Sequence, residues 1–220
     1  EGMYRSEETW VSRKRDAIFD PCVEALPSLG GKCVAITGCT TGTGFYTAVA
    51  AARKGAACIL LLNRSSERAV ESERAIKAMC GAETTVHTVD CDLRSLAAVR
   101  KAASETERIC AGFGGLDVLC NNAGIMMFPD ERTADGLEVQ MQVNHTSHFY
   151  LTKLLMPALE AAAASRGEAR VVQHSSGARN MFFADLEERY FARSEPGTLG
   201  GDRLHDKAMR YHMVPQYAMS

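Results

Sequence analysis

Residues 37–44 read Thr-Gly-Cys-Thr-Thr-Gly-Thr-Gly, a stretch in which three of eight residues are glycine. It follows the apolar run Cys33-Val34-Ala35-Ile36, typical of a buried strand, and it opens a helical stretch from Phe45 to Lys54. Glycines allow the backbone to turn tightly and to approach a diphosphate, and the first N–H groups of a helix attract its charge. The order of strand, turn and helix therefore predicts a phosphate cradle. An ordinary glycine-rich turn is the alternative, since a glycine pattern on its own is a weak signal.

Strands and helices alternate along the rest of the chain. Strands are predicted at 33–37, 57–62, 84–89, 116–121 and 170–175, and helices at 43–54, 66–80, 95–111 and 135–164. Strands separated by helices of this length are typical of βαβ units with a parallel sheet. The run Ile59-Leu60-Leu61-Leu62 is apolar on both faces, as in a sheet that helices cover on both sides. We therefore expect a three-layer α/β/α doubly wound fold of the Rossmann type, with strand order 3-2-1-4-5.

The domain organisation expected from these patterns is simple. Residues 1–29 form a charged lead-in with a short helix and a loop, and residues 30–220 form one domain. The polar residues 194–206, rich in glycine and proline, read as a long surface loop. The sequence begins at Glu1 rather than at Met, so the presence of a targeting segment ahead of it stays an open question.

Composition narrows the class of protein. The net charge is −2 and no basic block is present, so nothing favours nucleic acid or an anionic membrane as a partner. No apolar run approaches the roughly 20 residues of a membrane-spanning helix. The eight cysteines lie mostly in or beside apolar segments without CxxC pairs. Free, buried thiols in a reducing compartment, cytoplasmic or organellar, are the simpler interpretation.

The second predicted strand ends in residues that bear on cofactor choice. In a dinucleotide fold this edge meets the adenosine ribose, where an acidic residue binds the hydroxyls of NAD and an arginine pairs with the extra phosphate of NADP. Asn63 stands at the acidic position and Arg64 follows it. This pair favours NADP(H), with NAD the weaker candidate. The alternative for Arg64 is a solvated arginine at a helix start.

Polar residues also end the next two predicted strands. Asp92, which precedes Leu93, could accept a hydrogen bond from the adenine amino group, could cap the helix predicted from residue 95, or could do both. The fourth strand ends in Asn121-Asn122-Ala123-Gly124, at the edge where parallel sheets bind ligands. On its own this tetrapeptide would indicate only a turn.

Taken together, these motifs resemble those of the classical short-chain dehydrogenase/reductase superfamily over residues 30–220. Residues 37–44 match the family pattern TGxxxGxG, residues 121–124 match NNAG in full, and Asp92-Leu93 stands where the family has its adenine-binding pair. Several ordered motifs are far more specific than any one of them. The cofactor-binding residues that the resemblance implies are Gly38, Thr40, Thr41, Gly42, Thr43, Gly44, Asn63, Arg64, Asp92, Leu93, Asn122, Ala123 and Gly124.

Later motifs continue the resemblance in the same order. Residues 142–149, Gln-Val-Asn-His-Thr-Ser-His-Phe, are most similar to the retinol dehydrogenase and protochlorophyllide reductase-like branch. The implied catalytic residues are Tyr217 as proton donor or acceptor, Ser176 as the hydrogen-bond partner of the substrate oxygen, and Asn144 as the anchor of a relay water. Ser176 is preferred to Ser175 because the family's serine is the second of such a pair. The resemblance thus implies NADP(H)-dependent interconversion of an alcohol and a carbonyl on an apolar small molecule.

The C-terminal part departs from the family pattern. The family places a lysine four residues after its tyrosine, where it lowers the pKa of the phenol, and the sequence ends at Ser220 before that position. We therefore expect a truncated sequence that is inactive as it stands. An insert at about 185–210 lengthens the spacing before Tyr217, and Tyr211 and Tyr190 are weaker candidates for the same role.

Further expectations follow from single residues and from the resemblance. His145 and His148 could share a helix face, but a core or supporting role is favoured over a metal site. Met126-Met127 with Phe128, and Met181-Phe182-Phe183, could line an apolar substrate site or simply pack. Many family members form dimers or tetramers, so a homo-oligomer is implied. The alternative function is a catalytically inactive, dinucleotide-binding regulatory or scaffold protein.

Overall fold

A parallel five-stranded sheet forms the centre of the computed structural model, which describes residues 10–126, 128, 131–176 and 192–193. The strands run in the order β3-β2-β1-β4-β5, as the sequence predicts. Their bounds are β1 (Cys33–Thr37), β2 (Cys58–Asn63), β3 (Thr85–Asp90), β4 (Val118–Asn121) and β5 (Arg170–Gln173). The sheet reverses its order between β1 and β4, which is where open α/β sheets bind their ligands.

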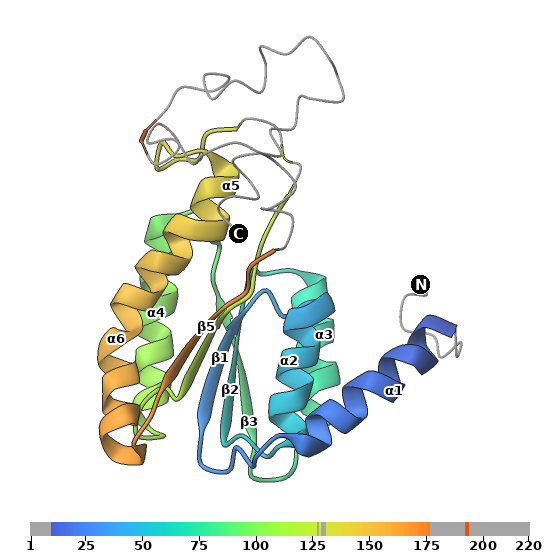
Figure 1. Ribbon diagram of the computed structural model, residues 1–220. Coiled ribbons are helices and arrows are strands. Elements are labelled where there is room, and N and C mark those ends of the chain that lie inside the picture. The colour runs from blue at the N-terminus through green and yellow to red at the C-terminus, as the bar shows by residue number, and fades with distance from the viewer. Residues whose placement is uncertain (1–9, 127, 129–130, 177–191, 194–220) are drawn as a thin grey trace.

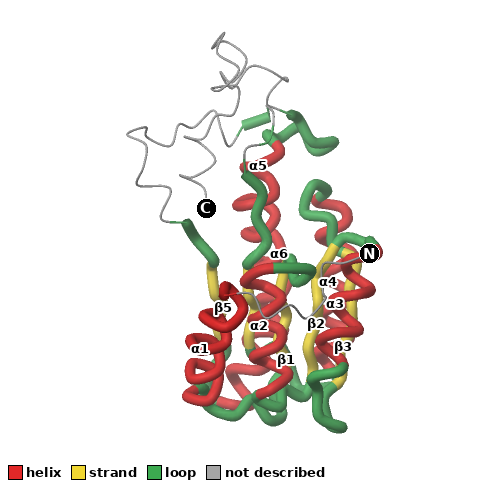
Figure 2. The backbone as a smooth tube through the Cα atoms, turned by 90° about the vertical axis from the view of Figure 1, so that its right-hand side faces the viewer, coloured by secondary structure: helices red, strands yellow, loops and turns green. Residues whose placement is uncertain are grey.

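Helices cover both faces of the sheet and give the predicted three layers (Figure 1). The helices are α1 (Trp10–Ala25), α2 (Gly42–Arg53), α3 (Glu67–Lys77), α4 (Leu96–Ala111), α5 (Val139–Met141) and α6 (Ser147–Arg166). A π-helical turn, η1 (Gln142–Thr146), joins α5 to α6. Helices α2 and α3 lie on one face, and α4 and α6 lie on the other. Figure 2 shows the loop after β4 rising beyond the strands toward α5.

The core follows from the alternation of side chains along the buried strands. Successive residues of a strand point to opposite faces of the sheet, and β1 and β2 are buried along their whole length. In β2, Ile59 and Leu61 therefore join the apolar cluster beneath α2 and α3, whereas Leu60 and Leu62 join the cluster beneath α4 and α6. Because both faces of β1 and β2 are buried, packing holds these two strands in place. The turns that follow them are therefore held in place as well.

Caps set the starts of the helices and correct two sequence-based expectations. Ser95, and not Asp92, caps α4, because the Ser95 side chain accepts the Ala98 N–H at 3.3 Å. The helix predicted from residue 135 begins only at Val139, where the Glu138 carboxylate accepts the Met141 N–H at 2.7 Å. Residues 131–138 instead form a loop, which Asp135 ties to α4 by accepting the Leu96 N–H at 2.8 Å.

A buried carboxylate connects elements at the other end of the sheet, where the strands begin. Asp117 accepts the Cys33 N–H at 2.7 Å and also pairs with the Arg166 guanidinium at 2.5 and 3.0 Å. Since Cys33 begins β1 and Arg166 ends α6, this group joins two elements that are remote in sequence.

Helix α1 packs against α2 through Phe19 and Tyr46, whose rings lie 5.2 Å apart. Among the described residues, no helix combines the length and apolarity that crossing a membrane requires.

Candidate functional site

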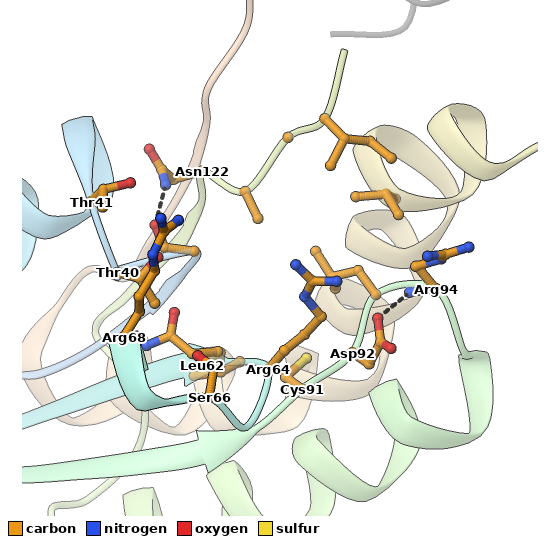
Figure 3. Close-up of a pocket in the computed structure, with 18 of the residues that line it drawn as sticks. Thr40, Thr41, Leu62, Arg64, Ser66, Arg68, Cys91, Asp92, Arg94 and Asn122 are labelled. Atoms are coloured by element: carbon orange, nitrogen blue, oxygen red, sulfur yellow. Dashed lines mark hydrogen bonds between the residues drawn. The ribbon is translucent and has the colours of Figure 1, made fainter. Parts of the chain in front are cut away.

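A cavity of about 500 Å³ opens at the carboxyl ends of the strands (Figure 3). Its walls come from the corners after β1, β2, β3 and β4 and from His174 after β5. All of the cofactor residues predicted from sequence line it except Gly42, which begins α2 beside them. The volume lies in the range of ligand pockets. Segments far apart in the sequence thus meet at the edge that the glycine-rich stretch predicts.

Two glycines make the corner after β1 compact. Gly38 has φ +70°, in the left-handed region that favours glycine, and a Cβ there would lie 2.9 Å from the Cα of Ala123. A Cβ on Gly44 would lie 2.2 Å from the Gly38 carbonyl oxygen and 2.4 Å from the Asn122 amide nitrogen. Side chains at these positions would push the corner away from the β4 turn, so the glycines are needed for this close packing.

The N-terminus of α2 faces the cavity without a side-chain cap. Thr41 is its N-cap residue, but its side chain makes no capping hydrogen bond, whereas Ser66 and Ser95 cap α3 and α4. Thr41 and Thr43 both line the cavity. The N–H groups of a first helical turn, at the positive end of the helix dipole, form a ready anion site.

The Asn63 side chain stabilises the turn after β1. Asn63 is only 3% exposed, and its Oδ1 accepts the Cys39 N–H at 2.7 Å. The neighbouring Arg64 is exposed and extends into the cavity together with Arg68, from the first turn of α3 (Figure 3). Arg68 was missed in the sequence. The available signal was its position four residues after Arg64, at the start of the following helix.

The corner after β3 supplies the only carboxylate among the described residues that line the cavity. Asp92 accepts the Arg94 N–H at 2.9 Å, and the Arg94 guanidinium pairs with Glu131 at 3.2 Å. Cys91 lines the cavity beside Asp92, and burial together with the charges of Asp90 and Asp92 raises the pKa of its thiol to about 12. Cys91 is therefore a neutral thiol at neutral pH and no thiolate nucleophile.

Hydrogen bonds connect the turn after β4 to the glycine-rich corner. The Thr37 hydroxyl accepts the N–H groups of Asn122 and Ala123 at 3.0 and 2.9 Å. The Asn122 side-chain amide donates to the carbonyl oxygens of Thr37 and Gly38 at 2.9 and 3.1 Å. Its Oδ1 lies 2.9 Å from Nδ1 of His174, a lining residue that the sequence analysis missed. His174 stands at the end of β5, which is recognised as part of the site only once the strand order is known.

The predicted catalytic residues are only partly within the described structure. Asn144 lies in η1 and holds Ile125, accepting its N–H at 2.8 Å and donating to its carbonyl at 2.9 Å. Ile125 and Val143 line the cavity, although Asn144 itself does not. Ser176 is half-buried, two residues beyond His174. Several other candidates lie outside the described residues: Tyr217, Tyr211, Tyr190, Met127, residues 181–183, and the insert 185–210 apart from residues 192 and 193.

The remaining candidates separate into cavity and non-cavity residues. Phe128 lines the cavity, but Met126 is exposed and does not. His148 is buried, as the favoured core role requires, whereas His145 is exposed. Within the part of the chain that the structure describes, no group of three or more His, Cys, Asp and Glu side chains could hold a metal ion. All eight cysteines are free thiols, and most are buried, as expected.

A comparison with known families identifies this arrangement. The sequence model of the family described as short chain dehydrogenase matches residues 32–187, which include the whole sheet and every corner of the cavity. The chain belongs to the short-chain dehydrogenase family. Its relatives place it in the retinol dehydrogenase-like branch of that family.

Curated relatives of this family member include three vertebrate dehydrogenases. Human retinol dehydrogenase 13 is 42% identical over 159 residues, covering 69% of this chain and 44% of the relative. Human retinol dehydrogenase 14 is 40% identical over 174 residues, covering 71% and 50%. Mouse polyprenol dehydrogenase is 36% identical over 163 residues, covering 74% and 47%. The chain thus spans about half the length of the curated relatives it matches.

Solved structures of the family share the fold. An uncharacterized protein from Mycobacterium Paratuberculosis has a TM-score of 0.61 and 31% identity, covering 90% of this chain and 60% of that one. RhlG of Pseudomonas aeruginosa, solved with NADP, has a TM-score of 0.58 and 27% identity, covering 74% and 60%. The NADH-dependent reductase A1-R', solved with NAD, has a TM-score of 0.58 and 25% identity, covering 74% and 66%.

Proposed function

We propose that the protein is an NADP(H)-dependent oxidoreductase that interconverts an alcohol and a carbonyl on an apolar substrate. The observation that carries this proposal is the uncapped N-terminus of α2 at the Gly38–Gly44 corner, opposite the guanidinium groups of Arg64 and Arg68. The corner would hold the diphosphate of a dinucleotide, and the arginines would meet its ribose end.

Two further features fit a dinucleotide in this cavity. The glycine corner has no room for a Cβ at Gly44, as a backbone cradle requires. The Asn63 amide nitrogen is buried and has no hydrogen-bond partner among the described residues, while Asn63 itself lines the cavity. A buried, unpaired donor costs stability, and a ribose or phosphate oxygen would satisfy it.

The choice of NADP(H) over NAD(H) rests on charge. An arginine at the ribose end pairs with the 2′-phosphate of NADP, whereas NAD needs an acceptor for its ribose hydroxyls. Arg64 and Arg68 extend into the cavity there, and Asn63 uses its oxygen to accept from Cys39. The relatives solved with a cofactor include both an NADP and an NAD complex. The proposed preference for NADP(H) over NAD(H) therefore depends on Arg64 and Arg68 of this chain.

The proposed chemistry takes over the residue roles that the family resemblance implies. A bound nicotinamide supplies or accepts the hydride. Ser176 would donate a hydrogen bond to the substrate oxygen and hold it in place, and Tyr217 would give or take the proton on that oxygen. Asn144 would anchor a relay water while its side chain holds the Ile125 backbone. Asn122, Ala123 and Gly124 would form the wall against which the cofactor lies.

The substrate class is inferred from the lining and from the relatives. Ile125, Phe128 and Val143 give one end of the cavity an apolar lining. Two relatives are named for retinol and one for polyprenol, which are apolar alcohols. Retinol with NADP⁺, and retinal with NADPH, are therefore the first substrate pairs to assay in the full-length protein.

The cofactor assignment is tested by replacing Arg64 with alanine. We expect Arg64→Ala to weaken NADPH binding by about 10- to 100-fold, because one charge-assisted phosphate contact is lost, and to change NADH binding by less than about threefold. Fluorescence titration of both reduced cofactors measures the effect.

The matched control is Arg74→Ala. Arg74 is an exposed arginine of α3 that does not line the cavity. Arg74→Ala should leave both affinities unchanged. An equal loss for NADPH and NADH in Arg64→Ala would reject the phosphate contact, and a native preference for NADH would reject the cofactor assignment.

A further inference from the structure

His148 lies behind the cavity and does not line it. It is 2% exposed, in the first turn of α6, and its ring contacts two elements at once. Nδ1 lies 3.1 Å from the Asn144 carbonyl oxygen in η1. Nε2 lies 2.9 Å from the hydroxyl oxygen of Thr37 at the end of β1. A buried ring with both nitrogens engaged has a defined tautomer.

The partners of the neutral ring fix its tautomer. A carbonyl oxygen only accepts, so Nδ1 carries the hydrogen and donates it to Asn144. Nε2 of the neutral ring then accepts, and the Thr37 hydroxyl donates to it. The Thr37 oxygen in turn accepts the N–H groups of Asn122 and Ala123 at 3.0 and 2.9 Å. The other acceptor near this hydroxyl, the Cys120 carbonyl, is farther away at 3.5 Å.

This pattern uses every hydrogen-bonding site of the Thr37 hydroxyl. Its one hydrogen goes to His148, and its two lone pairs accept from the β4 turn. A positively charged His148 would carry a hydrogen on Nε2 and could no longer accept from Thr37. Burial lowers the pKa of His148 to about 4, and the charge of His145, the titratable neighbour on η1, acts in the same direction. The ring is therefore neutral at physiological pH, as the hydrogen bonds require.

The two partners of His148 hold the two ends of one cavity wall. Thr37 fixes residues 122 and 123, and the Asn144 side chain fixes Ile125 through both its N–H and its carbonyl. We infer that His148 is a positioning residue for the dinucleotide, which sets the segment 122–125 by joining Thr37 to Asn144 from behind. This inference rests on the proposed function of the cavity.

The experiment compares NADPH affinity in variants of the full-length protein. His148→Phe keeps an aromatic ring but removes both nitrogens, whereas His148→Gln keeps an oxygen that can accept from Thr37. Ile76→Ala is the matched control, because Ile76 is fully buried in the other core cluster, beneath α3. It lowers stability by cavity formation alone.

We expect His148→Phe to weaken NADPH binding by about tenfold, and His148→Gln by less than about threefold, since the wall loses its support only in the former. Ile76→Ala should bind as the wild type does at a temperature where all variants are folded. A His148→Phe affinity equal to that of Ile76→Ala would show a merely structural role and overturn the inference.

If His148→Phe does not fold, a double-mutant cycle tests whether His148 acts on NADPH binding through Thr37. His148→Asn keeps a donor for the Asn144 carbonyl but cannot reach Thr37, and Thr37→Val removes the hydroxyl from the other side. If His148 acts through Thr37, the double variant binds NADPH no more weakly than Thr37→Val alone. Losses that add would overturn the inference.

Hydrogen exchange of the ligand-free protein separates this inference from the proposed function. The amides of Asn122 and Ala123 should exchange faster in His148→Asn than in Ile76→Ala, because only the former frees the Thr37 hydroxyl from its acceptor. Unchanged exchange would overturn the inference even if NADPH binds. A wild-type protein that binds neither NADPH nor NADH would instead overturn the proposed function, and with it the role in dinucleotide binding.

Discussion

Gly44 is the residue at which the smallest change should have the largest effect on the site. A Cβ there would meet the Gly38 carbonyl at 2.2 Å, and backbone cannot move aside as a flexible side chain can. Gly44→Ala should therefore displace the corner and weaken dinucleotide binding by more than about tenfold. Fluorescence titration with NADPH checks this, with Gly81→Ala as the control because a Cβ on Gly81 meets nothing within 4 Å. Equal affinities in the two variants would mean that the corner is not the cradle.

His148 makes the stability of the fold depend on pH. Its pKa is about 4 in the folded protein, below the ordinary value of 6.5, so the unfolded chain binds the extra proton between these values. Stability is therefore complete above pH 6.5 and falls as the pH drops toward 4. The loss should approach about 3 kcal/mol, from 1.36 kcal/mol per unit of pKa difference. Urea unfolding at pH 7, 6 and 5 measures the slope, and His148→Asn should lower it.

Single polar residues show where sequence reasoning loses precision. Asn63 and Asp92 were both expected to face a cofactor, and both line the cavity. The Asn63 oxygen, however, holds the Cys39 backbone, and the predicted capping role of Asp92 belongs to Ser95. The spacing of residues identifies the corner on which a side chain lies. The backbone group that it meets depends on the path of a neighbouring corner, which local sequence does not encode.

At the scale of elements, the Asp117 carboxylate joins β1, β4 and α6. It accepts from Cys33 at 2.7 Å and pairs with Arg166, and it is buried. Asp117→Ala should lower the free energy of unfolding by about 3 kcal/mol, because it leaves a buried N–H and a half-buried guanidinium without their partner. Glu168→Gln, which alters surface ion pairs with Arg170 and Lys32, should change it far less, because solvent screens these charges. Denaturant unfolding compares them, and similar values for both would contradict the assignment of Asp117 as a structural link.

The elements themselves could largely be predicted from the sequence. Strands such as β1 and β2 were located to within a residue, because fully apolar runs between helix-length segments have few other interpretations. The turn η1 was not predicted, since a shift of hydrogen bonding over five residues leaves no period of its own. The late start of α5 depends on the Glu138 cap and on the contact of Asp135 with Leu96, which is made across the fold.

At the scale of the whole molecule, the strand order and the position of the cavity followed from topology. Right-handed crossovers and two-sided burial leave few arrangements of alternating strands and helices, and these place the glycine-rich corner beside the β4 turn. His174 was missed because it joins the site only through that arrangement, and Arg68 was missed although its spacing from Arg64 offered a signal. Their residue types and local spacing are common on ordinary surfaces.

The proposed function requires that the corner of residues 38–44 holds the diphosphate of a nicotinamide dinucleotide. The decisive measurement is a crystal structure of the full-length protein grown or soaked with NADPH. We expect the diphosphate against the N-terminus of α2 and the 2′-phosphate beside Arg64 and Arg68. A dinucleotide bound elsewhere, or an empty corner at saturating NADPH in solution and in the crystal, would contradict the proposed function.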